Sequence, residues 1–237
     1  MSKVKYDIHE HRFAQAATLT QALAARIAEA LQSGLAAGRG ASLAVPGGHT
    51  PIALFERLSG ATLDWDNVWI TVTDERWVDV TSASSNEALV RTHLLRDAAA
   101  SAQFVGLKSA GTDVQTAASA SWSSVAEIPR PFDLMLLGMG DDGHVASLFP
   151  DSPGLPAALD LSQPPGCVAM HAPVAPHARM SLNLRALLDS RQIVLLIEGE
   201  AKWDTLQRAR MHGAATEMPV RALLQQQNVP VSVYWSP

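Results

Sequence analysis

Residues 132–144 read Phe-Asp-Leu-Met-Leu-Leu-Gly-Met-Gly-Asp-Asp-Gly-His, and this segment carries the clearest fold signal in the chain. Its first six residues are mostly large and apolar, as in a strand that is buried on both faces. The glycines and carboxylates that follow indicate a turn at the carboxyl end of that strand. Such a strand and turn are typical of α/β sheets, in which functional groups gather at the carboxyl ends of the strands.

The same pattern occurs three more times along the chain. Apolar runs at 43–45, 68–72 and 193–197 are each followed by a glycine or charged cluster and then by residues with helical spacing. Parallel strands that are covered on both faces have such continuous β-branched and leucine runs. The sequence therefore predicts an α/β fold with a Rossmann-like, mostly parallel sheet and helices on both faces. We expect the four clusters to converge at one edge of that sheet.

The remaining pattern predicts helices and a single domain. Apolar residues recur at three- and four-residue steps in 13–37, which is typical of an amphipathic helix. Shorter helices are expected at 52–58, at 86–95 and up to residue 210. The proline-rich segment 150–165 is expected to be a long surface loop. No repeat or linker is visible, so residues 1–237 are interpreted as one domain.

Composition excludes several classes of protein. The 237 residues are 47% hydrophobic and 17% charged, which rules out disorder. The 18 Lys and Arg against 23 Asp and Glu give a formal charge of −5 without a basic run, which argues against a nucleic-acid partner. The single cysteine, Cys167, excludes an intrachain disulfide and a multi-cysteine metal site. It fits a reducing compartment, and we expect a cytoplasmic protein.

The N-terminal part of the sequence indicates neither export nor a membrane segment. The basic residues near Met1 are not followed by the apolar run of a signal peptide. The alanine- and leucine-rich segment 13–37 is interrupted by Gln, Arg and Glu, which a membrane span of about 20 apolar residues would not carry. No membrane partner is expected.

The Gly-Gly-His-Thr-Pro loop at 47–51 has the properties of an anion cradle. The amides of Gly47 and Gly48 can approach a ligand closely, Thr50 can cap the following helix, and Pro51 suits the first helical position. The loop is neither a Walker sequence nor a full Gly-x-Gly-x-x-Gly, so nucleotide binding is unsupported. Because glycine turns before helices are common, a purely structural role stays open.

His144 is the histidine that the pattern favours as a general base. It follows the most apolar strand, and a neighbouring carboxylate such as Asp142 can orient its ring and fix its tautomer. The other histidines outside the glycine loop are expected to be structural or surface residues: His9, His11, His93, His171, His177 and His212.

Two further clusters add charge. Residues 74–76, Asp-Glu-Arg, follow the strand at 68–72, and the Arg76 guanidinium suits a phosphate or a carboxylate. Lys202, at the start of a helix, can supply a second positive charge to the same anion. The plainer alternatives are a solvated ion pair at 74–76 and an exposed helix lysine.

Taken together, the clusters resemble those of the 6-phosphogluconolactonase family. They occur in the family's order: 47–51, 74–76, 85–86, 138–150, Arg179 and 199–202. The resemblance spans residues from about 43 to 202, and the block 138–150 is highly specific. In the family's glycine loop a serine is more usual where this chain has His49.

The resemblance implies hydrolysis of 6-phospho-D-glucono-1,5-lactone, a step of the oxidative pentose phosphate pathway, with no metal and no organic cofactor. It makes His144 the base that activates water, while Asp74 or Asp142 orients the imidazole or the water. The groups it assigns to the phosphate and the oxyanion are Arg76, Arg179 and Lys202, with the amides of Gly48 and Thr50 in the loop that begins at Gly47. The only partner implied is a sugar-phosphate lactone, and the oligomeric state stays open, with a monomer plausible.

Two alternatives share parts of this pattern. Glucosamine-6-phosphate deaminases have a ring-opening Glu where this chain has Phe149, and a Tyr where it has Arg76. Sugar-phosphate sensors on the same scaffold carry a helix-turn-helix, for which the residues before 43 leave no room beyond one long helix. Both alternatives are therefore disfavoured.

Overall fold

Seven strands that pair only in parallel form the central sheet of the chain, in the order β1-β10-β9-β6-β2-β3-β5. The computed structural model describes residues 8–109, 111, 113–172 and 177–237. The strands of this sheet are β1 (His9–Arg12), β10 (Val231–Ser236), β9 (Ile193–Glu198), β6 (Leu134–Leu137), β2 (Ala41–Val45), β3 (Val68–Val72) and β5 (Gln103–Val105). The predicted α/β fold with a mostly parallel sheet is confirmed.

The strands in the middle of the sheet are those that the apolar runs predicted. Every residue of β2 and β6 is buried, as are the first five residues of β9. Three strands of this sheet were not predicted: β1, β5 and β10. The edge strands β1 and β5 are short and partly exposed, and β10 is interrupted by the partly exposed Ser232 and Trp235. Strands that are buried on both faces have continuous apolar runs, and these are the strands that could be predicted from the sequence.

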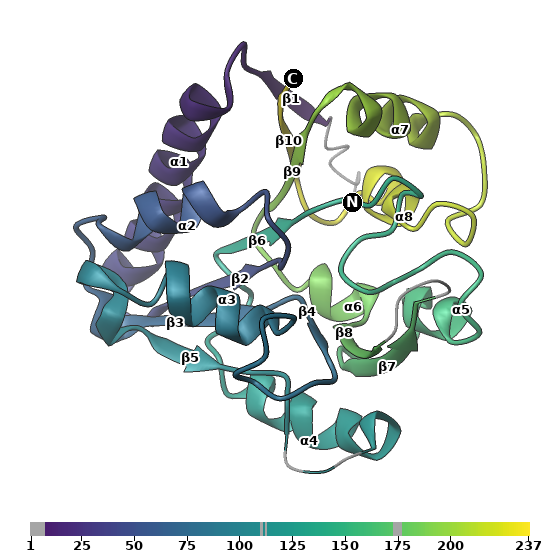
Figure 1. Ribbon diagram of the computed structural model, residues 1–237, viewed down its shortest axis with the longest axis horizontal. Coiled ribbons are helices and arrows are strands. Elements are labelled where there is room, and N and C mark those ends of the chain that lie inside the picture. The colour runs from purple at the N-terminus through teal and green to yellow at the C-terminus, as the bar shows by residue number, and fades with distance from the viewer. Residues whose placement is uncertain (1–7, 110, 112, 173–176) are drawn as a thin grey trace, which may run out of the picture.

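Helices cover the central sheet on both sides. Figure 1 shows α1 and α2 on one side of the strands β9, β10 and β6, with α7 and α8 on the other. The α-helices are α1 (Ala16–Ala36), α2 (Ile52–Ser59), α3 (Asn86–His93), α4 (Val114–Ala126), α5 (Leu155–Leu159), α6 (Leu184–Leu187), α7 (Glu200–Arg210) and α8 (Val220–Gln225), and two 3₁₀ turns span Trp65–Asn67 and Asp97–Ser101. Along α1, buried residues such as Leu23, Ile27 and Leu31 recur at helical spacing, as the amphipathic pattern predicted.

A second, antiparallel sheet, which shares no strand with the first, was not predicted. It consists of β4 (Asp74–Arg76), β8 (Ala178–Leu182) and β7 (Cys167–His171), and α4 packs against it. Residues 74–76, which were predicted only as a charged cluster after the strand at 68–72, form a strand because their backbone pairs with residues 179–181. Local sequence carries no signal for such a distant pairing.

The expectation of a long loop at 150–165 is wrong in part. The segment contains the short helix α5, with Leu155 and Ala158 buried. Pro156 lies in its first turn, where a helix makes no use of the N–H that proline lacks. Proline content therefore did not prevent a helix here.

Two expectations about the N-terminal part have different outcomes. Residues 1–7, on which the absence of a signal peptide was argued, lie outside the described residues. Among the described residues, no helix has the length and apolarity that crossing a membrane requires.

The contact between α1 and the start of β6 generates a stability prediction. A Cβ added at Gly34 would lie 2.6 Å from Oδ2 of Asp133, a buried carboxylate that accepts a 2.9 Å hydrogen bond from the Ser42 amide and pairs with Arg39. We expect Gly34→Ala to lower the free energy of unfolding by about 1–3 kcal/mol through overpacking, despite the better helix propensity of alanine.

Gly60 provides the matched control, because the nearest atom to its added Cβ is 4.0 Å away. Urea titration measures the free energy of unfolding of both variants. Gly60→Ala should change this free energy by less than about 1 kcal/mol. Equal effects of the two substitutions would show that α1 can move away from Asp133 at no cost.

Candidate functional site

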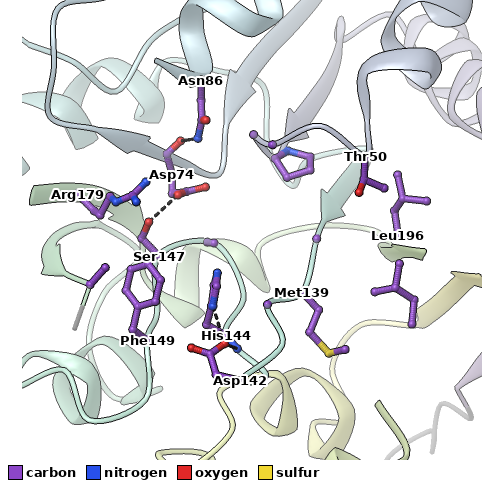
Figure 2. Close-up of a pocket in the computed structure, with 18 of the residues that line it drawn as sticks. Thr50, Asp74, Asn86, Met139, Asp142, His144, Ser147, Phe149, Arg179 and Leu196 are labelled. Carbon is purple, nitrogen blue, oxygen red and sulfur yellow. Dashed lines mark hydrogen bonds and ion pairs between the residues drawn. The ribbon is translucent and has the colours of Figure 1, made fainter. Parts of the chain in front are cut away.

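A cleft of about 680 Å³ lies at the carboxyl edge of the central sheet. It is lined by the loops that follow β2, β6 and β9, together with residues of the small sheet (Figure 2). All nine residues that the sequence singled out are on its wall: Gly47, Gly48, Thr50, Asp74, Arg76, Asp142, His144, Arg179 and Lys202. The four clusters predicted to converge therefore meet in one cavity.

His144 and Asp142 form a close pair on the wall of this cleft. The imidazole Nδ1 lies 2.6 Å from Oδ1 of Asp142, and the same oxygen accepts a 3.0 Å hydrogen bond from the His144 amide. The His144 side chain is 30% exposed, so water can reach it. An ionised carboxylate only accepts hydrogen bonds, so Nδ1 carries a proton, and in the neutral imidazole Nε2 is then the nitrogen with the lone pair.

Asp142 is held in its charged form by this geometry. Partial burial opposes ionisation, but the hydrogen bonds from the ring and the amide of His144 outweigh it and lower the pKa of the Asp142 carboxyl. The carboxylate is therefore the group that sets the ring's tautomer and orientation.

The loop that carries the pair depends on two glycines. Gly140 donates its amide to the His144 carbonyl, and the Gly143 amide returns to the Gly140 carbonyl. Gly143 adopts a φ of +81°, a conformation that other residues rarely adopt. At Gly140, a Cβ would overlap both the His144 ring and the Asp142 carboxylate, so the pair can form only against a bare backbone.

Asp74 has other partners than the histidine. Its carboxylate is buried, and it accepts hydrogen bonds from the hydroxyls of Ser147 (2.5 Å) and Thr73 (3.3 Å). Of the two acids that could orient the imidazole, the one bonded to His144 is Asp142. Asp74 faces the cleft from the opposite wall, beside Arg179 in Figure 2.

Glu75 has a structural role rather than the solvated ion pair considered for this cluster. Its carboxylate accepts hydrogen bonds from the amides of Asn86 and Glu87 (both 2.7 Å) and from the Ser85 hydroxyl, so it binds the N-terminus of α3. Burial raises the pKa of the Glu75 carboxyl, although these donors oppose the shift.

Two guanidinium groups lie side by side on the small sheet. Arg76 and Arg179 are directly opposite each other in the β4–β8 register. Burial lowers the pKa of Arg179, and the neighbouring Arg76 adds to that effect, while the carboxylates of Asp74 and Glu75 oppose it. The Nε atoms of both arginines are buried with no hydrogen-bond partner among the described residues. Because like charges on facing positions repel, this arrangement favours an anion between them.

Lys202 contributes a third cation from the first turn of α7. Its ammonium lies 3.0 Å from Oδ1 of Asp141, whose side chain is 80% exposed. An ion pair that is this open to water is weak, so an anionic ligand can displace the carboxylate.

The glycine loop meets α3 at the same cleft. Gly48 adopts a φ of +89°, and a Cβ at Gly47 would overlap the Asn86 side chain, whose amide donates to the Asp74 carbonyl. The expected capping role of Thr50 is wrong: α2 has Pro51 at its N-cap position and begins without a side-chain cap. The chain turns one residue later than predicted, which leaves the Thr50 hydroxyl on the cleft wall.

The lining residues that were not predicted as site residues include Asn86, Ser147, Phe149 and Glu198. Glu198 ends β9, and the rule that functional groups follow the strands could have found it. Burial raises the pKa of the Glu198 carboxyl. The Phe149 ring lies 4.6 Å from the His144 ring, centroid to centroid, and so supplies an apolar wall beside the imidazole.

The six histidines that were expected to be structural lie away from this site, whereas His49 of the glycine loop lines it. None of the six that were expected to be structural lines the cleft; His11 stacks on Tyr234, and His93 pairs with Glu56. Within the described ranges, His, Cys, Asp and Glu side chains form no group of three or more that could hold a metal ion.

Comparison with known proteins identifies a family and close relatives. Residues 14–235 match the family described as "Glucosamine-6-phosphate isomerases/6-phosphogluconolactonase". The chain is 40% identical to the 6-phosphogluconolactonase of Pseudomonas putida over 99% of its own length and 96% of the relative's. It is 42% identical to that of Pseudomonas aeruginosa, with coverage of 94% and 92%. The crystal structure of a 6-phosphogluconolactonase from Shewanella baltica superposes with a TM-score of 0.94 at 42% identity, over 98% of both chains.

The close approach of Gly140 to the acid–histidine pair is testable by titration. We expect Gly140→Ala to push the ring away from Asp142, so that the pKa of the Asp142 carboxyl rises toward its ordinary value as its donors are lost. Carboxyl titration by NMR measures this shift directly.

Gly138→Ala is the matched control, since no atom lies within 4 Å of its added Cβ. It should leave the titration of Asp142 unchanged. An unaltered Asp142 titration in Gly140→Ala would mean that the pair does not need the bare backbone.

Proposed function

The chain belongs to the family of glucosamine-6-phosphate isomerases and 6-phosphogluconolactonases, and we propose that it hydrolyses 6-phospho-D-glucono-1,5-lactone to 6-phospho-D-gluconate. This reaction is a step of the oxidative pentose phosphate pathway. The observation that carries the proposal is the Asp142–His144 pair, which lies in one cleft with three cations. The cytoplasmic location and the oligomeric state stay predictions.

His144 acts as the general base in the proposed mechanism. Nε2 accepts a proton from a water molecule as the water oxygen attacks the lactone carbonyl, and Asp142 stabilises the imidazolium that forms. When the tetrahedral intermediate collapses, the carbon–oxygen bond of the ring breaks and Nε2 returns the proton to the departing ring oxygen. The two steps consume one water molecule and regenerate the neutral imidazole.

The cations neutralise the two negatively charged groups of the reaction, which are the phosphate of the substrate and the oxyanion of the intermediate. Arg76 and Arg179 form a fixed pair of guanidinium groups, and Lys202 exchanges Asp141 for the substrate's anion. The amides around Gly48 and Thr50 add further donors, and Asp74 faces the cleft as the acid that can orient the attacking water.

This chemistry needs no protein nucleophile. A δ-lactone is already an activated ester, and a positioned base typically contributes about 10² to 10⁴ in rate. The sequence contains no Gly-x-Ser-x-Gly nucleophile elbow. One histidine with oriented donors is sufficient.

The isomerase branch of the family is the alternative reaction, and Phe149 argues against it. The deaminases use a Glu at this position to open the sugar ring, whereas the buried Phe149 ring here cannot transfer a proton. Arg76 likewise replaces a tyrosine of the deaminases. Glucosamine 6-phosphate should therefore release no ammonia with this protein.

The direct test is release of 6-phosphogluconate from freshly prepared lactone, measured with a coupled 6-phosphogluconate dehydrogenase assay. Because the lactone also hydrolyses unaided, the substrate without protein is the blank. Release no faster than the blank contradicts the proposed function, and ammonia release from glucosamine 6-phosphate would move the chain to the deaminases.

The role of the base is tested with His144→Gln. This variant should lower kcat by about 10² or more while KM stays within a few-fold, because the lost proton transfer matters in the transition state. A variant with near wild-type turnover at neutral pH would show that the base is elsewhere.

The role of the cations is tested with Arg179→Ala and Lys202→Ala. Each removes a charge-assisted contact worth roughly 1.5–3 kcal/mol, so each should raise KM for the phosphorylated lactone about tenfold or more. Unphosphorylated glucono-1,5-lactone is the control, and its slower hydrolysis should change little. Equal losses on both substrates would assign these cations to the carbonyl or to the fold.

A further inference from the structure

We propose that Ser147 is a positioning residue that holds the His144 loop against the small sheet, and so keeps the base aligned with the cations. This inference rests on the proposed function, because it concerns the geometry of that reaction. Ser147 is completely buried and lies on the wall of the cleft between His144 and Asp74 (Figure 2).

Ser147 makes two hydrogen bonds to the small sheet. Its hydroxyl donates to Oδ2 of Asp74 on β4 at 2.5 Å, and its amide donates to the hydroxyl of Ser181 on β8 at 3.2 Å. Ser181 in turn donates to the Leu182 carbonyl, so its hydroxyl oxygen is oriented toward the Ser147 amide. The hydrogen bond to Asp74 is short because its acceptor is a carboxylate.

These bonds connect the two parts of the cleft that bring different groups to the substrate. His144 belongs to the loop after β6, a strand of the central sheet. Arg76 and Arg179 belong to β4 and β8 of the separate antiparallel sheet. Ser147, three residues after the base, bonds to both of these strands, so its position fixes the base relative to the paired guanidiniums.

The backbone next to Ser147 needs this support. Residues 145–148 form a tight turn, in which the Leu148 amide donates to the Val145 carbonyl at 3.0 Å. Ala146 has a φ of +49°, in the region that non-glycine residues avoid. A strained residue persists only where its surroundings hold it, and the two bonds of the adjacent Ser147 do so here.

The geometry separates catalysis from substrate binding. Arg76 and Arg179 are held together by the β4–β8 ladder, which does not involve Ser147. Loss of the Ser147 hydroxyl should therefore leave the cation pair intact while the base drifts from its alignment. We expect Ser147→Ala to lower kcat about 10- to 100-fold with KM within threefold, as for other small misplacements of reacting groups.

Two further variants separate the hydrogen bond from packing. Ser147→Cys fills the space that Ser147→Ala empties, with a slightly larger side chain, but its thiol is a weak donor, so it should lose most of the activity that Ser147→Ala loses. Ser121→Ala removes another buried hydroxyl, which donates to the Leu107 carbonyl between α4 and the preceding loop, and it should keep wild-type kcat. Full activity in Ser147→Cys, or an equal loss in Ser121→Ala, would assign the effect to packing or to general destabilisation.

A double-mutant cycle with Asp74 tests whether Ser147 acts through its bond to that carboxylate. If it does, Ser147→Ala combined with Asp74→Ala should have a kcat no more than about threefold below that of Asp74→Ala alone, because both changes remove the same interaction. Losses that multiply would show that Ser147 acts independently of Asp74, which contradicts the proposal.

The two hydrogen bonds from Ser147 to Asp74 and Ser181, called the tether here, can be tested by amide hydrogen exchange without any lactone. In Ser147→Ala the amides of residues 144–149 should exchange at least tenfold faster than in the wild type and in Ser121→Ala. Unchanged exchange would overturn the tether even if the enzyme is a lactonase. An inactive wild type with faster exchange in Ser147→Ala would instead reject the proposed function and keep the tether.

Discussion

The burial of the central strands on both faces is the constraint on which the rest of the structure depends. Because β2, β6 and β9 have no solvated face, their buried side chains are uncharged, and the hydroxyl of Ser42 on β2 donates to the Pro129 carbonyl. The charged groups of the cleft lie where each strand leaves the sheet, and parallel strands leave it at the same edge. The glycine loop, the acid–histidine pair and Lys202 are therefore forced into one cleft.

The cleft contains two pairs of charged or titratable side chains whose arrangement does not depend on a ligand. Oδ1 of Asp142 accepts from both the ring and the amide of His144, so the carboxylate orients the imidazole. Arg76 and Arg179 face each other, and their mutual repulsion is countered in part by the carboxylates of Asp74 and Glu75. Under the proposed function, both features are in place without substrate, so binding and proton transfer need little reorganisation.

The small antiparallel sheet is the part of the fold that completes this cleft. It brings both guanidiniums and Asp74 to the central sheet's edge, although β4 and β8 are far apart in the chain. Ser147 lies where the two sheets meet and bonds to each strand that carries a cation. The cleft is therefore formed by residues of both sheets.

Local residue patterns determined the fold class and the composition of the cleft. Continuous apolar runs revealed the buried strands, and the polar clusters after them, including the histidine loop and Lys202, could be expected to meet because parallel strands share an edge. The roles within each cluster were decided only by tertiary structure. Asp142 contacts the imidazole because the turn after β6 brings it next to His144, two residues further on, whereas Asp74 bonds to Ser147, 73 residues later in the chain. Glu75 binds the N-terminus of α3. Sequence near a residue shows which groups it can offer, whereas the long-range partner that occupies Asp74 is set by the fold and is not encoded in a local pattern.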